Sequence, residues 1–134
     1  MVQHTFENKN IYKDFDLSFG RNPLTNDIGK KTDVKAINQS MKMLLNTYYY
    51  ERPFRPDVGS NLRRILFEPA DVITIQDLRA SIESLIINYE PRVSLIGVKI
   101  RDNSENNAYD ISIEYRLNNM VQSQNFTSTL RRLR

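Results

Sequence analysis

Four carboxylates are the residues of this sequence best suited to acid–base chemistry: Glu51, Asp57, Glu68 and Glu90. A glycoside hydrolase needs two carboxyl groups, roughly 5–5.5 Å apart for retention or 6.5–9.5 Å apart for inversion. Each of the four also has a structural explanation, namely an arginine neighbour, a turn, a helix end or a helix-to-strand junction. Because no substrate cleft and no acid–base pair are evident, we treat hydrolysis as the alternative and predict that the protein is not an enzyme.

Other catalytic and ligand-binding chemistries lack the residues they need. There is no cysteine and one histidine, His4, so thiolate nucleophiles, disulfides and the usual zinc ligand sets are not expected. The four glycines are scattered, and residues 14–16 lack the glycine and terminal glutamate of a calcium loop. We expect no cofactor, no metal and no small-molecule substrate.

The charge distribution argues against nucleic acid as a partner. The chain has 134 residues, with 19 basic and 16 acidic side chains, and three of the arginines lie among the last four residues. The first 130 residues are therefore formally neutral, whereas a phosphate-binding surface needs cations clustered across one face. Apolar runs are too short for a membrane span, so we expect no membrane partner either.

Arginine and tyrosine are the residues that suggest a protein interface. Twelve of the 19 basic residues are arginine, which suits bidentate pairs and is enriched at interfaces together with tyrosine. The residues in question are Tyr48, Tyr49, Tyr50, Arg52, Phe54, Arg55, Arg63, Arg64 and Arg92. A solvated basic face over core aromatics is the alternative explanation.

Periodicity predicts the helices that must position these residues. Apolar residues recur on one face over 33–46, with Thr32 or Asp33 as the cap, which predicts an amphipathic helix. A longer helix is predicted from a Thr74 cap to residue 89, because one apolar stripe runs along it and a proline follows. The aromatic, proline-rich stretch 48–60 predicts an ordered loop, and 62–67 a short helix.

After the long helix, the period becomes that of β-strands. The apolar phase changes between residues 93–95 and 96–100, which predicts a strand with a bulge at that point. Residues 109–117 alternate most clearly, 118–119 suit a two-residue turn, and 120–130 form a weaker third strand.

We therefore predict an α+β fold with one main domain over residues 33–134. N-terminal helices (33–90) pack on one face of a C-terminal three-stranded antiparallel β-meander (92–130). Residues 1–32 form an extended N-terminal segment, in which the alternation over 15–19 suits a strand or a clamp across the surface.

The last strand is the candidate docking edge. Residues 120–130 contain neither charge nor proline, the features by which monomeric proteins block an open edge. The edge is either covered by the N-terminal segment or receives a strand from a partner. The side chains assigned to a docking edge are Gln122, Gln124, Phe126, Ser128 and Leu130.

Three motifs resemble a known family. They are ERPFRPDVGSNL (51–62), LFEP (66–69) and NYEPRV (88–93). They resemble the small baseplate wedge proteins of contractile-tailed phages, the "lysozyme-like" sheath initiators that have relatives in type VI secretion baseplates. The resemblance covers about residues 33–117, and Glu90-Pro91-Arg92 matches the family's Glu-Pro-Arg motif.

The resemblance implies a structural role in the virion tail baseplate, assembled in the host bacterial cytoplasm. The implied partners are other baseplate wedge proteins, the tail sheath subunit, which would attach by strand exchange, and the tail tube proteins. The residues assigned to wedge contacts or to the helix–sheet junction are Arg52, Phe54, Arg55, Glu90, Pro91 and Arg92. No catalytic pair is matched; a baseplate peptidoglycan hydrolase, or a type VI secretion or tailocin subunit, is the alternative.

Overall fold

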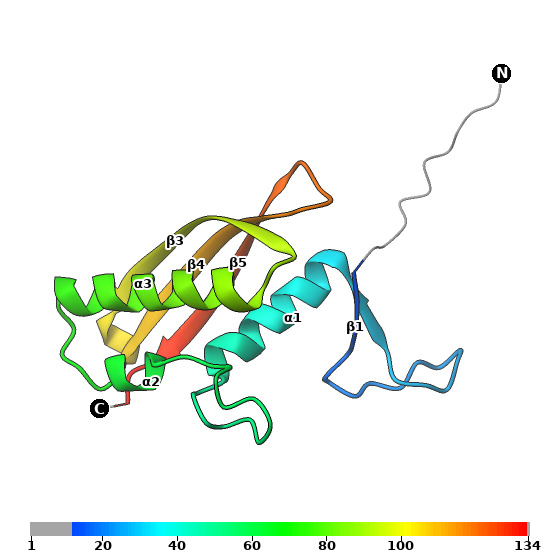
Figure 1. Ribbon diagram of the computed structural model, residues 1–134, viewed down its shortest axis with the longest axis horizontal. Coiled ribbons are helices and arrows are strands. Elements are labelled where there is room, and N and C mark those ends of the chain that lie inside the picture. Colours follow the sequence, from blue (N-terminus) through cyan, green and yellow to red (C-terminus); the bar gives the residue numbers. More distant parts are fainter. Residues whose placement is uncertain (1–11, 134) are drawn as a thin grey trace.

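The structure is a computed structural model that describes residues 12–133 (Figure 1). Its helices are α1 (Asp33–Asn46), α2 (Leu62–Ile65) and α3 (Val72–Tyr89). Its strands are β1 (Lys13–Phe15), β2 (Lys30–Thr32), β3 (Val93–Asn103), β4 (Ala108–Leu117) and β5 (Ser123–Arg131), with the 3-10 helix η1 (Ser104–Asn106) between β3 and β4.

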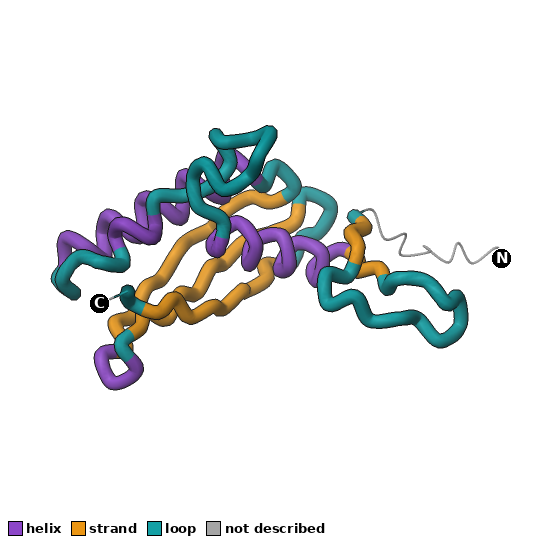
Figure 2. The backbone as a smooth tube through the Cα atoms, turned by 90° about the horizontal axis from the view of Figure 1, so that it is seen from below, coloured by secondary structure: helices purple, strands orange, loops and turns teal. Residues whose placement is uncertain are grey.

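The predicted α+β architecture is confirmed. The C-terminal sheet has the antiparallel order β3-β4-β5, and the helices cover one face of it, with α3 beside β3 and α1 beside β5 (Figures 1 and 2). The core lies between these layers. It is built from the inner stripes of α1 and α3 and from alternate residues of β4, of which Tyr109, Ile113 and Tyr115 are fully buried.

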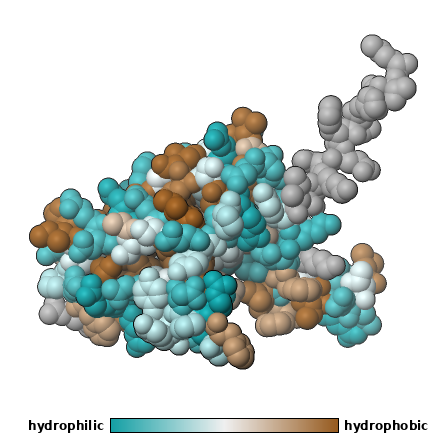
Figure 3. Space-filling model, viewed as in Figure 1, coloured by the Kyte–Doolittle hydropathy of each residue, from teal (hydrophilic) through white to brown (hydrophobic). Residues whose placement is uncertain are grey.

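The two long helices follow the predicted periodicity, with one correction at a helix start. The first predicted helix coincides with α1. The long helix begins earlier than predicted, because Asp71 is the N-cap and its carboxylate accepts a hydrogen bond from the Thr74 N–H at 2.7 Å. The predicted Thr74 cap is therefore wrong, since Thr74 lies at the third position of the helix and its own N–H is capped by Asp71. Apolar Ile73 and Ile87 lie on the exposed side of α3, where Figure 3 shows brown surface.

The bulge in the first strand is confirmed, and residues 118–119 form a turn closed by the Met120 N–H, which donates to the Leu117 carbonyl at 3.0 Å, but the predicted two-residue hairpin connection is wrong. The register of β3 against β4 shifts between Leu95 and Gly97. The β4–β5 connection takes residues 118–122, because pairing with β4 begins only at Ser123, opposite Arg116. Asn118 extends the ladder to β3: its N–H donates to the Arg92 carbonyl at 3.1 Å and its side-chain amide to the Pro91 carbonyl at 2.9 Å.

The described part of the N-terminal segment, residues 12–32, folds back on itself as the antiparallel β1–β2 hairpin. The predicted strand over 15–19 is wrong after Phe15, because the Asp16 carboxylate accepts hydrogen bonds from the backbone and hydroxyl of Ser18 and turns the chain. The hairpin projects beyond the sheet and ends against α1 (Figure 1). The expected position of residues 1–11 lies outside the described residues.

The loop between α1 and α2 is ordered, as predicted, and depends on a glycine. Gly59 has φ of 145°, and a Cβ there would stand 2.6 Å from the Tyr48 carbonyl carbon. This close approach allows Tyr48 and Ser60 to form a parallel bridge. The helix that follows is shorter than predicted, because the Phe67 and Glu68 N–H groups bond three residues back and tighten the last turn.

None of the described helices combines the length and apolar character needed to cross a membrane.

Candidate functional site

The outer edge of β5 is the candidate docking site. Strand β5 pairs with β4 on one side, and among the described residues no strand pairs with its other side. The position of the third strand at a sheet edge is thus confirmed, although β3 forms a second free edge on the opposite side of β4.

The hydrogen-bond ladder decides which backbone groups of β5 are open. The Arg132 N–H donates to the Asn107 carbonyl at 2.9 Å, so these residues form a hydrogen-bonded pair. Hydrogen-bonded and non-hydrogen-bonded pairs alternate along an antiparallel ladder. The even-numbered residues of β5 therefore bond to β4, whereas Asn125, Thr127 and Thr129 direct their N–H and C=O groups to the outer edge.

The side chains assigned to the docking edge point toward the helices. Phe126 lies opposite Ile113 and packs against the core, and Leu130 is buried opposite Tyr109. Gln124 and Ser128 are half-buried on the same side, whereas Gln122 precedes the strand. A guest strand would thus meet open backbone groups at odd-numbered positions, and its own alternate side chains would lie beside the even-numbered ones.

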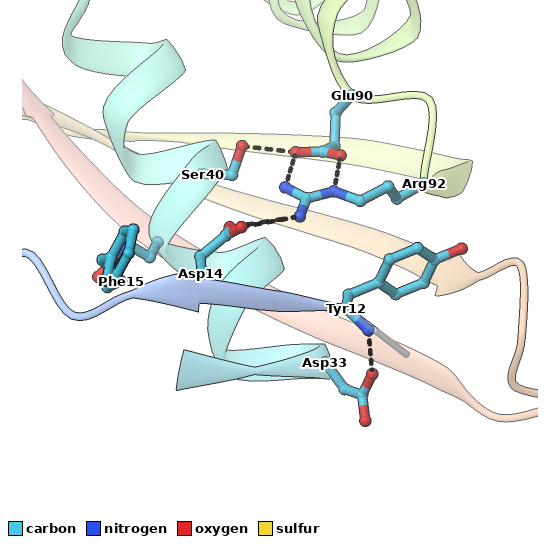
Figure 4. A network of polar contacts seen from close by, with 8 residues as sticks. Tyr12, Asp14, Phe15, Asp33, Ser40, Glu90 and Arg92 are labelled. Carbon is cyan, nitrogen blue, oxygen red and sulfur yellow. Dashed lines mark hydrogen bonds and ion pairs between the residues drawn. The ribbon is translucent and has the colours of Figure 1, made fainter. Parts of the chain in front are cut away.

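Glu90 and Arg92 form the most buried charged contact of the described chain. Glu90 is the C-cap of α3, and its side chain is 2% exposed. Its carboxylate accepts two hydrogen bonds from the Arg92 guanidinium, at 2.7 and 2.9 Å, and one from the Ser40 hydroxyl of α1 (Figure 4). Arg92 also contacts Asp14 of β1 at 3.3 Å. Across the turn at Pro91, this cluster joins α3, α1, β1 and the start of β3.

The electrostatics of the cluster favour both charges. Burial alone would raise the pKa of the Glu90 carboxyl, but hydrogen bonds from Arg92 and Ser40 outweigh it and hold that pKa below its usual value. The hydrogen bonds to Glu90 raise the pKa of the Arg92 guanidinium. Burial, followed by the negative charge of Glu90, raises the pKa of Tyr115 to about 12, and its hydroxyl donates to the Asn38 side chain at 2.6 Å.

The second predicted contact region is the exposed tip of the α1–α2 loop. Phe54 is 95% exposed, and Arg52 beside it is exposed as well. Arg55 forms an exposed bidentate pair with Asp57, with both distances 3.2 Å. The loop is held by backbone turns and by the Tyr89 hydroxyl, which donates to the Asp57 carbonyl. The sequence places Arg52, Phe54 and Arg55 with Glu90 and Arg92 in one candidate set, but the former are exposed and the latter are not.

Three of the four candidate carboxylates have structural roles within the chain, and the fourth, Glu68, is half-buried just after α2. Glu51 accepts the Tyr48 N–H at 2.9 Å, Asp57 pairs with Arg55, and Glu90 pairs with Arg92. The hydrogen bond from Arg55 is the first cause of a lowered pKa of Asp57. In the part of the chain that the structure describes, no group of three or more candidate ligands could hold a metal ion.

Sequence reasoning missed Asp14 and Ser40 as partners of the Glu-Pro-Arg motif. They are 78 and 50 residues away from Arg92 and Glu90 in the sequence. In the sequence, Asp14 belongs only to an incomplete calcium-loop pattern, and Ser40 lies on the partly exposed side of an ordinary amphipathic helix. No local pattern marks either residue, so only the packing of α1 and β1 could identify them.

Comparison with known proteins decides the family. Residues 31–121 match the family described as baseplate wedge protein gp25, which covers well over half of the chain. The chain belongs to this family. Baseplate wedge protein gp25 of Enterobacteria phage T4 is 31% identical over 74 residues, which are 55% of this chain and 56% of the phage protein. The chain thus matches little more than half the length of that relative.

Solved structures agree with the family. A chain of the six-fold symmetrised anti-feeding prophage baseplate superposes with a TM-score of 0.71 at 25% identity, covering 83% of this chain and 89% of that one. A Geobacter sulfurreducens protein described as a candidate tail lysozyme has a TM-score of 0.67 at 25% identity, covering 71% and 86%. A chain of the type VI secretion baseplate complex shares the fold, with a TM-score of 0.60 at 16% identity over 70% and 88%.

The gp25-family assignment confirms the predicted resemblance and its structural character. The chain is a baseplate wedge protein of the gp25 family, a structural component whose place is the tail baseplate of a phage-like contractile system.

Proposed function

We propose that this gp25-family protein starts sheath assembly by receiving an extended segment of the tail sheath subunit at the outer edge of β5. The single observation that supports this is the open edge itself, where the backbone groups of Asn125, Thr127 and Thr129 lack a partner among the described residues. An added strand would bond to these groups, and its alternate side chains would set the register.

The remaining surfaces suit contacts with other baseplate proteins. The exposed Arg52, Phe54 and Arg55 of the loop tip combine an aromatic anchor with arginines, the residue types enriched where interfaces are strongest. We assign this tip to a neighbouring wedge protein or a tail tube protein. The buried Glu90–Arg92 pair is assigned to the helix–sheet junction, because its carboxylate is already engaged within the chain.

A ring of copies would bind the sheath tightly even though each single strand pairing is weak. One added strand contributes a few hydrogen bonds, and each is worth only about 0.5–1.5 kcal/mol net. Several wedges in one baseplate present several edges to linked sheath subunits, and linked contacts bind far more tightly than single ones. We therefore propose that the baseplate ring, and not the isolated chain, binds sheath subunits tightly enough to start the sheath.

The decisive experiment removes one outer hydrogen-bond donor without touching the internal ladder. In Thr127→Pro, the lost N–H faces the outer edge, a position at which an edge strand tolerates proline. Baseplates reconstituted with this variant should nucleate sheath at least tenfold less often than wild type, counted as sheathed tails by electron microscopy. The matched control is Asp102→Pro, which removes an outward N–H from the edge of β3 and should leave nucleation unchanged.

Folding of the variant is checked separately. Circular dichroism and thermal melting of isolated Thr127→Pro should match the wild type. If proline disturbs the strand, an N-methylated Thr127 introduced by semisynthesis removes the same donor with less constraint on the backbone. Sheath assembly at the wild-type level on either folded variant would refute the proposal.

We further propose that the chain has no peptidoglycan hydrolase activity. A glycosidase acid needs a raised pKa and access to the substrate. Glu90 is buried in an ion pair, and the pKa values of both Glu90 and Asp57 are lowered. Purified protein should leave the turbidity of a cell-wall suspension unchanged. Clearing that disappears in at least one of the single carboxylate-to-amide variants of Glu51, Asp57, Glu68 and Glu90 would establish the hydrolase instead.

A further inference from the structure

A basic groove lies beside the open edge of β5. This groove, which we call the α1 groove, has a volume of about 770 Å³ and lies between α1, the β1–β2 hairpin and β5. Its apolar part includes Met43 of α1, Leu17 of the hairpin and the half-buried ring of Phe126. The ring of Phe126 is the contribution of β5, so the groove begins where the sheet ends.

The charged residues of the α1 groove are mostly lysines. Lys35 and Lys42 are exposed on α1 and form no ion pair with any described residue, whereas Lys31 pairs with Asp16 at 3.2 Å. The groove is lined by one carboxylate, that of Glu51, which already accepts the Tyr48 N–H. The groove therefore presents two lysines without an ion-pair partner among the described residues and one carboxylate, a net positive charge, beside an apolar floor.

A strand added to β5 would direct half of its side chains into this groove. Side chains of neighbouring strands that lie on the same face of a sheet stand side by side. The helix-facing residues of the added strand would thus follow Phe126 toward α1. They would recur every roughly 6.6–6.8 Å, while Lys35 and Lys42 are seven residues, or about 10.5 Å, apart along the helix axis. Two acidic residues four positions apart, with an apolar one midway, would match this spacing within the reach of a lysine side chain.

We propose that the segment received by β5 is acidic on its helix-facing side, with the pattern acid–x–apolar–x–acid. The apolar side chain would lie on Phe126 and Met43, and the carboxylates would meet Lys35 and Lys42. This inference rests on the proposed function, because it describes the chemistry of the segment that the open edge accepts. A second copy of β5 does not fit, since residues 120–130 contain no carboxylate.

Synthetic peptides added to the full-length protein test the pattern. Three seven-residue peptides have leucine at the centre and differ only in their second and sixth residues, which are both Glu, both Gln or both Lys. Their other residues are threonine. Binding is followed by NMR shifts of the Asn125, Thr127 and Thr129 amides, which detect weak complexes. At low salt, the Glu peptide should bind about tenfold more tightly than the Gln peptide, and added salt should reduce this difference.

Charge reversal distinguishes the groove from a general attraction. Lys35→Glu/Lys42→Glu should lose the preference for the Glu peptide and gain one for the Lys peptide. The matched control is Lys99→Glu/Arg101→Glu, which reverses two exposed charges on the opposite face of the same sheet and should keep the wild-type preference. Equal affinity for the three peptides, or an unchanged preference in Lys35→Glu/Lys42→Glu, would overturn the inference.

Thr127→Pro separates this inference from the proposed function. If all three peptides bind equally and Thr127→Pro abolishes their binding, the edge accepts strands and only the acidic pattern is wrong. If the Glu peptide binds Thr127→Pro as tightly as wild type, the groove binds acidic peptides without strand pairing, and both the inference and the proposed docking mode fail.

Discussion

The two edges of the C-terminal sheet differ in how they are protected. Strand β3 follows a proline, contains a bulge at Leu95–Gly97, carries the charged residues 99, 101 and 102, and is tied at its start to the Glu90–Arg92 cluster. Strand β5 is regular over nine residues and has no charge before Arg131. Bulges, charges and proline are the features by which proteins discourage edge-to-edge pairing.

The difference teaches which edge is available to a partner. Within residues 12–133, both strands leave alternate backbone groups without a partner strand on their outer sides, as the alternation of the two ladders requires. On β3, a regular guest strand would have to follow the bulge, where Ile96 is displaced from the ladder. On β5, a guest strand meets an unbroken row of outward backbone groups. The α1 groove lies beside this row, and its lysines would attract an acidic segment. The proposals above depend on this asymmetry.

The largest expected effect breaks the cluster at the start of β3. In Glu90→Ala, Arg92 loses its bidentate partner and Ser40 its acceptor, which should lower the free energy of unfolding by roughly 3–5 kcal/mol. Urea denaturation followed by circular dichroism measures it. Asp57→Ala, which breaks the exposed pair with Arg55, should cost at most about 1 kcal/mol. Similar losses for the two variants would mean that the cluster is not the anchor of β3.

The next effect compares neighbouring prolines in β5. Ser128→Pro removes an N–H that bonds to β4 and should destabilise the fold by about 3 kcal/mol, whereas Thr127→Pro should cost less than about 1 kcal/mol. Amide hydrogen exchange of the wild type checks the same assignment: residues 124, 126 and 128 should exchange slowly, and 125, 127 and 129 fast. If Thr127→Pro were less stable than Ser128→Pro, the outward-facing positions would be the even-numbered ones. The proline test of docking would then have no basis.

A third effect concerns the pH dependence of the cluster. Because the folded-state pKa of Glu90 lies below its usual value of 4.5, the folded chain holds its proton less readily than the unfolded one. The stabilisation is present above that usual value and is lost as the pH falls through the folded-state pKa. The stability difference between wild type and Glu90→Gln should therefore narrow on acidification from pH 7. A difference that stays constant down to pH 3 would contradict the assigned ion pair.

The smallest effect concerns the displaced residue of the β3 bulge. Ile96 is 55% exposed and has no partner in the register of β3 against β4. Ile96→Thr should change the stability by no more than about 0.5 kcal/mol, whereas Val98→Thr, at a buried position of the same strand, should cost more. Equal costs in thermal melting would place Ile96 in the core and remove the distinction between the two edges.

The sequence was most informative where structure is local. The span of α1, the stop of α3 before Pro91, the bulge in β3 and the edge position of the last strand all follow from periodicity and turn chemistry. Its errors were also local. Asp71 replaces Thr74 as the helix cap, and the turn at 118–119 lies within a longer connection because β5 begins to pair with β4 only at Ser123.

By itself, the sequence determined the order and type of the elements, the resemblance carried by its three motifs and the absence of charge along the last strand. These depend on residue periods and on neighbours in the chain. Only the tertiary structure decided that Glu90 is buried against Ser40 and Arg92, that Asp14 joins them, and that Lys35 and Lys42 border the open edge of β5. The reason is physical: such contacts join residues tens of positions apart, and their geometry exists only once helices and sheet have packed.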